Sequence, residues 1–300
     1  MPAIFLDGLP AKNKARRWII FVKNFGMVIS ARSWYKDWFN SPFYHKLYFE
    51  RDEQEAKDFI ERLIVFLQPP PASKMLDVAC GRGRHCKILA ELGFDVIGID
   101  LSPNSIDYAN QFVAAGKDNL QFFVHDMRLP LRVNYFDYAF NLFTSFGYFA
   151  TRREHDDAMH AIAASLKPGG IFVIDYLNVH YAEDHLVHAE EKNIGGTFYN
   201  IHRWHDEHHF YKNIQVEDAS LTEPLECTEK VAKLFLGDFT DMLAYQGMQV
   251  LEVFGDYHLA PYDVKKTPRL IIIAKKSGGD KPAEKEKRLY SDGRATDALA

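Results

Sequence analysis

The chain has 300 residues, of which 47% are hydrophobic and 26% charged, and its formal net charge is −5. This length and composition can bury the core of one α/β domain or two small domains, and the negative charge argues against a general nucleic-acid-binding protein. The three cysteines, Cys80, Cys86 and Cys227, form no disulfide framework and no zinc spacing, so reduced thiols and a cytoplasmic location are expected.

The two ends of the chain are expected to lie outside the folded domain, which is assigned to 31–277. In residues 1–30 basic residues precede an apolar run, but Lys23 and Asn24 interrupt that run, and it is too short for a transmembrane helix. An extension is therefore expected there, with a basic amphipathic segment that contacts a membrane or a partner as the alternative. Residues 278–300 are polar and rich in charge, which predicts a disordered tail.

Helical and strand patterns alternate through the middle of the chain. Apolar residues at helical spacing predict a first helix at 52–67, which ends before three consecutive prolines. Alternation of helices with short, continuously apolar strands then predicts a parallel, doubly wound α/β sheet. The strands are expected at 74–80, 95–100, 120–126, 136–143 and 171–176, with helices at 83–93, 102–116 and 155–170.

Two further strand patterns complete the expected sheet. Residues 248–254 are expected to run parallel to the first five strands and residues 269–276 to return antiparallel, so their connection lies at the carboxyl edge. Polar and apolar residues alternate across 178–235, which predicts an inserted sheet of three antiparallel strands. The expected fold class is α/β: a doubly wound, seven-stranded, Rossmann-like sheet with a small antiparallel β insertion.

A glycine-rich turn follows the first strand in the stretch "MLDVACGRGRH". Ala79, Gly81 and Gly83 alternate along it, and Asp77 precedes them. Ligands of such sheets bind beyond the carboxyl ends of the strands. A dinucleotide fingerprint would place a glycine where Cys86 stands and does not require Asp77, so a dehydrogenase is disfavoured.

The acidic residue followed by alternating small residues resembles motif I of the class I S-adenosylmethionine-dependent methyltransferases, with Ala79 in place of the first glycine. Later features keep that family's order: Asp100 ends the second strand, Asp126 the third and Asn141 the fourth, and "LKPGG" precedes the fifth. The stretches "WFNSPFYHKLYFERDEQEA", "CGRGRH", "NLFTSFGYF" and "TPRLIIIAKK" resemble a bacterial group of this family whose substrate is unassigned. This resemblance covers roughly residues 34 to 276.

The resemblance implies that S-adenosylmethionine is the cofactor. The glycine loop would let the backbone approach the aminocarboxypropyl arm, and the Asp100 carboxylate would accept hydrogen bonds from the ribose hydroxyls. Asp126 stands where the family binds the adenine amino group. The residues expected to bind the cofactor are Asp77, Ala79, Gly81, Gly83, Asp100, Leu101, Asp126, Met127 and Asn141.

The end of the fourth strand bears on the substrate. Methyltransferases that act on amino groups of DNA and some RNA carry an Asn/Asp-Pro-Pro-aromatic signature there, whereas this chain has "NLFTS" without prolines. Asn141 and Phe143 therefore suggest a small-molecule pocket, with Phe143 as a substrate contact. Core packing is the alternative for the phenylalanines of this stretch.

Tyr44 and Tyr48, which are four residues apart, are expected to share a face of an N-terminal helix. In similar small-molecule methyltransferases such a helix lies over the cofactor and offers a tyrosine. Tyr44, Tyr48 and Asn141 are therefore the candidate catalytic residues. A simple packed amphipathic helix is the alternative for at least one of the tyrosines.

The insertion at 178–235 is expected to form a roof over the active site, as in the family that the chain resembles. An inward Arg203 could bind a substrate carboxylate, or it could be solvated. Tyr257 and Arg269, at the connection before the last strand, are expected to contact substrate or to brace the roof. The histidines of "HRWHDEHH" straddle a turn, so no metal site is expected.

The leading functional hypothesis is a cytoplasmic S-adenosylmethionine-dependent methyltransferase that acts on N or O of a small molecule. The alternatives are a non-catalytic S-adenosylmethionine-binding regulatory module and a methyltransferase that acts on a protein or RNA. No nucleic-acid partner and no transmembrane segment are expected. No residue is a forced general base, since positioning of an amine nucleophile could suffice.

Overall fold

The computed structural model describes residues 34–48, 53–113 and 118–278. The expected N-terminal extension (1–30) and nearly all of the expected tail (278–300) lie outside these described residues. Within the described ranges, no helix combines the length and the apolar character that crossing a bilayer requires.

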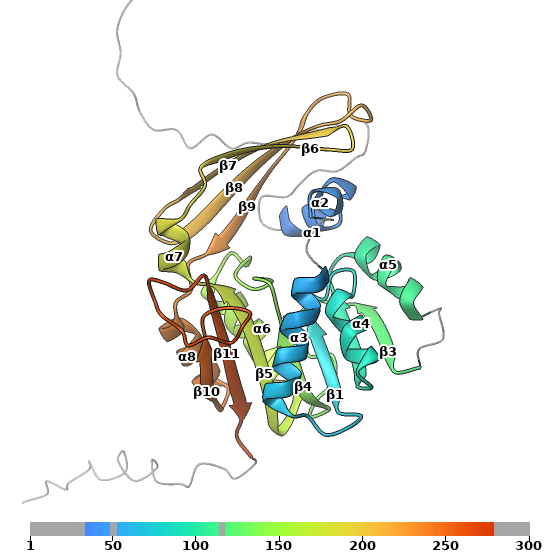
Figure 1. Ribbon diagram of the computed structural model, residues 1–300, viewed down its shortest axis with the longest axis vertical. Coiled ribbons are helices and arrows are strands. Elements are labelled where there is room, and N and C mark those ends of the chain that lie inside the picture. The colour runs from blue at the N-terminus through green and yellow to red at the C-terminus, as the bar shows by residue number, and fades with distance from the viewer. Residues whose placement is uncertain (1–33, 49–52, 114–117, 279–300) are drawn as a thin grey trace, which may run out of the picture.

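The predicted seven-stranded α/β sheet is confirmed and forms the centre of the molecule (Figure 1). Its strands are β1 (Lys74–Val78), β2 (Asp95–Asp100), β3 (Leu120–Val124), β4 (Phe136–Asn141), β5 (Leu166–Leu177), β10 (Met248–Phe254) and β11 (Arg269–Lys276). The spatial order is β10-β11-β5-β4-β1-β2-β3. Strand β11 runs antiparallel to the other six strands of this sheet, so those six strands end at one carboxyl edge.

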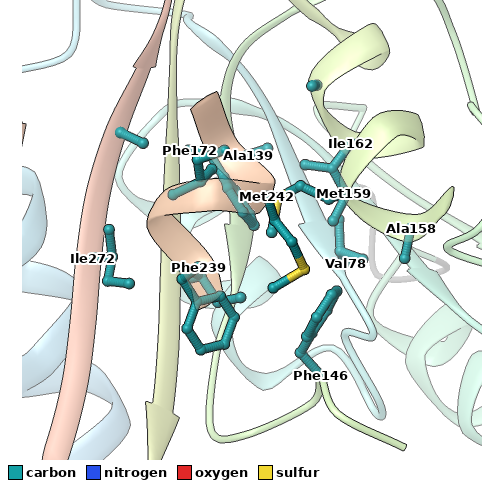
Figure 2. Packing of buried hydrophobic residues seen from close by; sticks show 14 of the residues in the cluster. Val78, Ala139, Phe146, Ala158, Met159, Ile162, Phe172, Phe239, Met242 and Ile272 are labelled. Carbon is teal, nitrogen blue, oxygen red and sulfur yellow. The ribbon is translucent and has the colours of Figure 1, made fainter. Parts of the chain in front are cut away.

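Helices cover both faces of this sheet, which explains why its strands are apolar on both sides. These helices are α3 (Glu53–Leu67), α4 (Arg84–Glu91), α5 (Pro103–Val113), α6 (Arg152–Ser165) and α8 (Leu236–Tyr245). Successive residues of β11 alternate between the faces: Ile271 and Ile273 pack in the cluster that includes α3, α4 and α5, and Ile272 packs with α6 and α8. Figure 2 shows Phe239 and Met242 of α8 facing Phe146 and Ile272 in the cluster on the α6 and α8 face of the sheet.

Strands β1, β3 and β4 each end two residues earlier than predicted, so Asp126 follows β3 instead of ending it. Two other element boundaries differ by more. Helix α6 begins at Arg152, earlier than expected, because Thr151 and Glu154 form a reciprocal capping box. Strand β5 begins at Leu166, so "LKPGG" belongs to the strand rather than to the end of the helix. Neither difference moves the carboxyl edge of the sheet.

The predicted antiparallel insertion forms a second sheet of four strands, one more than expected. These strands, which we call the roof sheet, follow the short helix α7 (Val179–Asp184) and are β6 (Ala189–Ile194), β7 (Thr197–His205), β8 (His209–Glu217) and β9 (Leu225–Ala232). The additional strand is β6, which is mostly exposed and charged and therefore lacks an alternating pattern. Gly195 and Gly196, with φ of 52° and 83°, turn the chain from β6 into β7.

Two short helices, α1 (Trp34–Phe39) and α2 (Pro42–Leu47), lie under the roof sheet (Figure 1). A single N-terminal helix was expected, but Ser41 caps the second helix and Pro42 occupies its first turn, so the chain starts a new helix there. Trp38 and Leu47 pack against Tyr199 and Ile214 of the roof sheet. The helix pair α1–α2 therefore connects the roof sheet to the region above the carboxyl edge.

The insertion leaves and rejoins the central domain at one place. The hydroxyl of Tyr176, near the end of β5, donates a hydrogen bond of 2.6 Å to the carbonyl of Ala232, the last residue of β9. The amide of Ala232 donates one of 2.8 Å to the carbonyl of Gly147. A side chain at Gly147 would overlap the Tyr176 hydroxyl. The two ends of the insertion are thus fixed to each other.

Candidate active site

A cavity of about 670 Å³ lies at the carboxyl edge of the parallel strands. This volume is within the range of sites that hold small molecules. The described residues that line it come from the ends of β1, β2, β3 and β4 and the loops that follow them, from α1 and α2, from the first turns of α3, and from α4 and α5. The helix pair reaches the cavity with Tyr35, Phe39, Tyr44, His45 and Tyr48.

The glycine loop after β1 presents its backbone to this cavity. Ala79 and Gly81 line the cavity with φ of 59° and 55°, and a Cβ at Gly81 would meet nothing within 4 Å. Gly83 is not among the described lining residues. Its φ is 79°, and a Cβ there would lie 2.5 Å from the ring of Phe122. Gly81 therefore leaves room for a ligand at the backbone, whereas Gly83 lets the loop pack on β3.

Asp100 joins the glycine loop to the end of β2. One carboxylate oxygen accepts a hydrogen bond of 2.8 Å from the amide of Gly81, and the other accepts one of 2.8 Å from the amide of Ser102. Burial raises the pKa of Asp100, and these backbone donors oppose that rise. Each carboxylate oxygen can accept more than one hydrogen bond, so this cavity-lining group also suits a diol such as a ribose.

Asp77 lies behind the loop and is 1% exposed. Its burial raises its pKa to about 7, and a hydrogen bond of 3.2 Å from the Cys86 thiol opposes the rise. The carboxyl group also lines the cavity. A cationic ligand group above the loop would favour its ionised form. The loop, Asp77 and Asp100 together fit a ligand with an amino group and a ribose.

Asp126, Leu101 and Met127 form another part of the wall. Arg128 binds the Asp126 carboxylate through Nη2 at 2.6 Å and Nε at 3.0 Å. Burial alone would raise the pKa of Asp126, but the Arg128 contacts outweigh it and lower that pKa. Leu101 and Met127 are partly buried and add apolar surface next to this ionised group.

Asn141 is fully buried at the end of β4 and is not one of the described residues that line the cavity. Its Nδ2 donates a hydrogen bond of 2.9 Å to the carbonyl of Val78, which ties β4 to the strand that leads into the glycine loop. Its Oδ1 is a buried acceptor with no hydrogen-bond donor among the described residues. Asn141 therefore holds the end of β4 against the strand that leads into the glycine loop.

The turn after β4 (residues 142–145) is strained. Phe143 and Thr144 line the cavity with φ of 58° and 57°, and positive φ is costly for residues other than glycine, above all for a β-branched one. Asp175, which is fully buried, accepts a hydrogen bond of 2.7 Å from the Phe143 amide. Its own carbonyl accepts one of 3.0 Å from the Thr144 amide. Asp175 therefore holds the strained turn in place.

Tyr257 and Arg269 act on the same turn from the other side. The Tyr257 hydroxyl donates a hydrogen bond of 3.1 Å to Asp175, and its ring stacks on Phe143 with centroids 4.9 Å apart. Arg269 pairs with Asp175 at 2.7 Å and donates a hydrogen bond of 2.9 Å to the hydroxyl of Thr144. Neither residue is among the described lining residues. The structure thus places both behind the cavity wall.

Of the residues expected in the roof and the helix pair, the structure brings two to the cavity. Tyr44 and Tyr48 both line it, and their ring centroids lie 4.8 Å apart. Arg203 does not line it within the described chain; it pairs with Glu190 on the adjacent strand at 2.5 Å. Over the same described ranges, no group of His, Cys, Asp or Glu side chains is arranged to hold a metal ion.

Several residues near the cavity were not predicted. His45 lines it, and burial together with the charge of Arg82 lowers the His45 pKa to about 4, so the ring is neutral at pH 7. Lys212 and Glu229 contact Tyr48 from the roof sheet. Both occupy inward positions of alternating strands that are otherwise apolar, and this charge pattern is a signal that the sequence contains.

The sequence family described as a methyltransferase domain matches residues 70–231, more than half of the chain. The chain is 31% identical over 121 residues to dTDP-3-amino-3,4,6-trideoxy-alpha-D-glucopyranose N,N-dimethyltransferase of Streptomyces venezuelae, over 40% of this chain and 48% of that protein. It is 33% identical over 124 residues to dTDP-3-amino-3,6-dideoxy-alpha-D-glucopyranose N,N-dimethyltransferase of Streptomyces fradiae, over 41% and 46%. The chain thus spans about half the length of these curated relatives.

Solved structures share the fold at low sequence identity. An S-adenosylmethionine-dependent methyltransferase from Clostridium acetobutylicum superposes with a TM-score of 0.67 at 20% identity, over 79% of this chain and 97% of that one. CalS10, an amino pentose methyltransferase from Micromonospora echinaspora solved with S-adenosylmethionine bound, superposes with a TM-score of 0.58 at 21% identity, over 79% and 98%. These superpositions cover most of this chain and nearly all of each solved structure.

Proposed function

The chain belongs to the class I S-adenosylmethionine-dependent methyltransferases, and from that premise we propose that it methylates a nitrogen or oxygen atom of a small molecule. The observation that carries the proposal is the cavity of about 670 Å³ under the helix pair; none of its described lining residues comes from the roof sheet. A cavity of that size accommodates a cofactor and a small acceptor, whereas a macromolecular substrate needs an extended surface.

The cofactor side of the cavity has the groups that S-adenosylmethionine requires. The backbone at Gly81 would approach its amino-acid arm, and Asp100 would accept hydrogen bonds from its ribose. The carboxylate of Asp77, in its ionised form, would attract its ammonium group. Leu101 and Met127 would contact the adenine, with Asp126 beside them. When bound, the cofactor supplies an electrophilic methyl group on a positively charged sulfur.

The rest of the cavity would position the nucleophile and exclude water. Tyr44, Tyr48 and Phe143 present aromatic surface there, and aromatic rings interact favourably with a nearby cation. We assign Tyr44 and Tyr48 to substrate contact and Asn141 to support of the β4 end. Tyr257 and Arg269 then act on the substrate only through the turn that they hold.

An amine is the first candidate for the acceptor group. The two curated relatives are named as N,N-dimethyltransferases of dTDP-linked amino sugars, and CalS10 is described as an amino pentose methyltransferase. An amine is also nucleophilic in its neutral form, so positioning supplies a large part of the rate. A small amine, such as an amino sugar, is therefore the proposed substrate class.

The proposal is tested first by binding and then by product analysis. Titration calorimetry should show that S-adenosylmethionine and its demethylated product bind more tightly than NADH. The protein is then incubated with isotope-labelled S-adenosylmethionine and, separately, with amino-sugar nucleotides, a small-molecule extract, total RNA and total protein. Label in the small-molecule arms supports the proposal. Tighter NADH binding, or label only in RNA or protein, would overturn it.

A further inference from the structure

Two charged residues of the roof sheet face the cavity side of the molecule. Lys212 on β8 and Glu229 on β9 are directly opposite each other in the antiparallel register, with Nζ and Oε2 4.0 Å apart. Their neighbours on the inward face of these strands include Ile214, Val216 and Cys227, which are buried in an apolar cluster. A charged pair among apolar residues is expensive to desolvate, so its presence requires a reason other than stability.

The pair meets at the hydroxyl of Tyr48. This hydroxyl lies 3.1 and 3.3 Å from the two carboxylate oxygens of Glu229, to which it donates, and it accepts a hydrogen bond from Lys212. The indole of Trp38, which is fully buried, donates a hydrogen bond of 2.8 Å to Glu229 and fixes the carboxylate. Tyr48 itself lines the cavity. Tyr48 therefore connects the cavity to a buried carboxylate.

This arrangement has the parts of a proton relay. A phenolic hydroxyl can donate its proton and accept hydrogen bonds at the same time, and the Tyr48 hydroxyl donates to Glu229 and accepts from Lys212. An N–H or O–H of a nucleophile in the cavity could pass its proton to the same oxygen. The charged groups that contact the hydroxyl among the described residues are Lys212 from β8 and Glu229 from β9. The charge of Asp37, on α1, acts on Cys227 in the same apolar cluster.

We propose that Tyr48 accepts the proton that the nucleophile releases during methyl transfer, with Glu229 and Lys212 as positioning residues that act through it. This inference rests on the proposed function and adds the proton acceptor that the sequence does not specify. It extends the site from the helix pair into the roof sheet.

The step balances within the site. As the nucleophile forms its bond to the methyl carbon, the carbon–sulfur bond breaks and its electron pair stays on sulfur. The proton of the nucleophile passes to the Tyr48 oxygen while the Tyr48 proton passes to Glu229. The positive charge lost at sulfur is matched by the negative charge lost at Glu229, and Lys212 stabilises the partial negative charge on the phenolic oxygen during the transfer.

The first test needs no substrate. In protein labelled with ¹³C at the tyrosine ζ carbon, the Tyr48 resonance is identified as the one missing from Tyr48→Phe. Glu229→Gln removes a nearby negative charge and should lower its titration midpoint by about one pH unit or more, and Lys212→Met should raise it by a similar amount. The exposed Glu226→Gln on the same strand is the control and should change nothing. Unchanged midpoints in both test variants would overturn the inference.

The second test uses an acceptor identified in the product analysis. Glu229→Gln should lower kcat by about 100-fold and shift the pH profile of kcat, with the Kd for S-adenosylmethionine unchanged. Trp38→Phe removes a contact to Glu229 but keeps the relay, so it should lower kcat much less. Equal losses of kcat in both variants would mean that the cluster only supports the structure, which would refute the relay. A wild-type kcat in Glu229→Gln would also refute the relay but would leave the methyltransferase function intact. Failure of the wild-type protein to bind S-adenosylmethionine would refute the function itself.

Discussion

The two sides of the cavity are built in different ways. On the cofactor side, Gly81 and Asp100 are 19 residues apart in sequence; Gly81 follows β1 and Asp100 is the last residue of β2. On the proposed acceptor side, Tyr48, which follows α2, contacts Glu229 of the inserted sheet, 181 residues away. The cofactor side thus depends on local loops, whereas the proposed acceptor side depends on the packing of the helix pair against the roof sheet. Changes on one side should leave the other largely intact.

Removing Asp175 should cause the largest loss of stability, because it supports the wall between the two sides. Asp175→Ala leaves Arg269 without its buried partner and releases the strained turn. We expect a loss of about 3–5 kcal/mol in the free energy of unfolding, measured by urea denaturation. Asp156→Ala breaks an exposed ion pair with Arg152 and should cost at most about 1 kcal/mol. Similar losses in the two variants would mean that Asp175 does not anchor the turn.

Asp77 should give the cofactor side a distinct pH dependence. Its pKa is about 7 in the folded protein against 3.8 for the ordinary group, so the folded state keeps a proton that the unfolded state has lost. The associated stability is fully present below about pH 4 and is lost as the pH rises to about 7. Relative to wild type, Asp77→Asn should therefore gain up to about 4 kcal/mol in free energy of unfolding over this range. Urea denaturation at several pH values measures this difference, and a constant difference would contradict the assignment.

Replacing Asp100 should change the affinity for the cofactor and leave the side of the cavity at Tyr48 unchanged. Asp100→Ala should cost about 1.5–3 kcal/mol of affinity for S-adenosylmethionine in titration calorimetry, the range for hydrogen bonds to a charged group. It also frees the Gly81 amide, so part of the loss comes from the loop. Asp95→Ala, at the opposite end of β2, is the control and should bind normally. The Tyr48 titration should be the same in all three proteins; a shift in Asp100→Ala alone would show that the two sides are coupled.

Arg203 should have the smallest effect. It pairs with Glu190 at a partly exposed edge of the roof sheet, away from the cavity. Arg203→Ala should change the free energy of unfolding by at most about 1 kcal/mol and leave the Kd for S-adenosylmethionine and the KM of the acceptor unchanged. A several-fold rise in that KM would bring Arg203 back into the acceptor site.

The difference between local loops and long-range packing explains which contacts the sequence could predict. Asp77, Gly81 and Asp100 could be predicted to meet because parallel strands of one sheet end at one edge, so a sequence pattern is enough. The partners of Tyr48 could not be predicted, because contact between the end of α2 and β9 depends on how elements far apart in the sequence pack together. Only the charged inward positions of Lys212 and Glu229 pointed there.

The contacts of Tyr257 and Arg269 are a second feature that the sequence could not predict. Both were expected at the carboxyl edge on the substrate side, and both lie near the turn after β4. Which face of that turn they contact depends on Asp175, an acidic residue within the apolar run "IFVIDY". A buried charge requires a buried partner, but the sequence does not say which residue supplies it.

The bond between Tyr176 and Ala232 has an evolutionary consequence. Because it closes the insertion at its base, the segment from α7 to β9 can lengthen, shorten or be replaced while the central sheet keeps its own hydrogen bonds. The insertion carries Lys212 and Glu229, whereas the glycine loop and Asp100 lie outside it. A lineage can therefore inherit cofactor use unchanged and acquire a new acceptor by exchanging one segment.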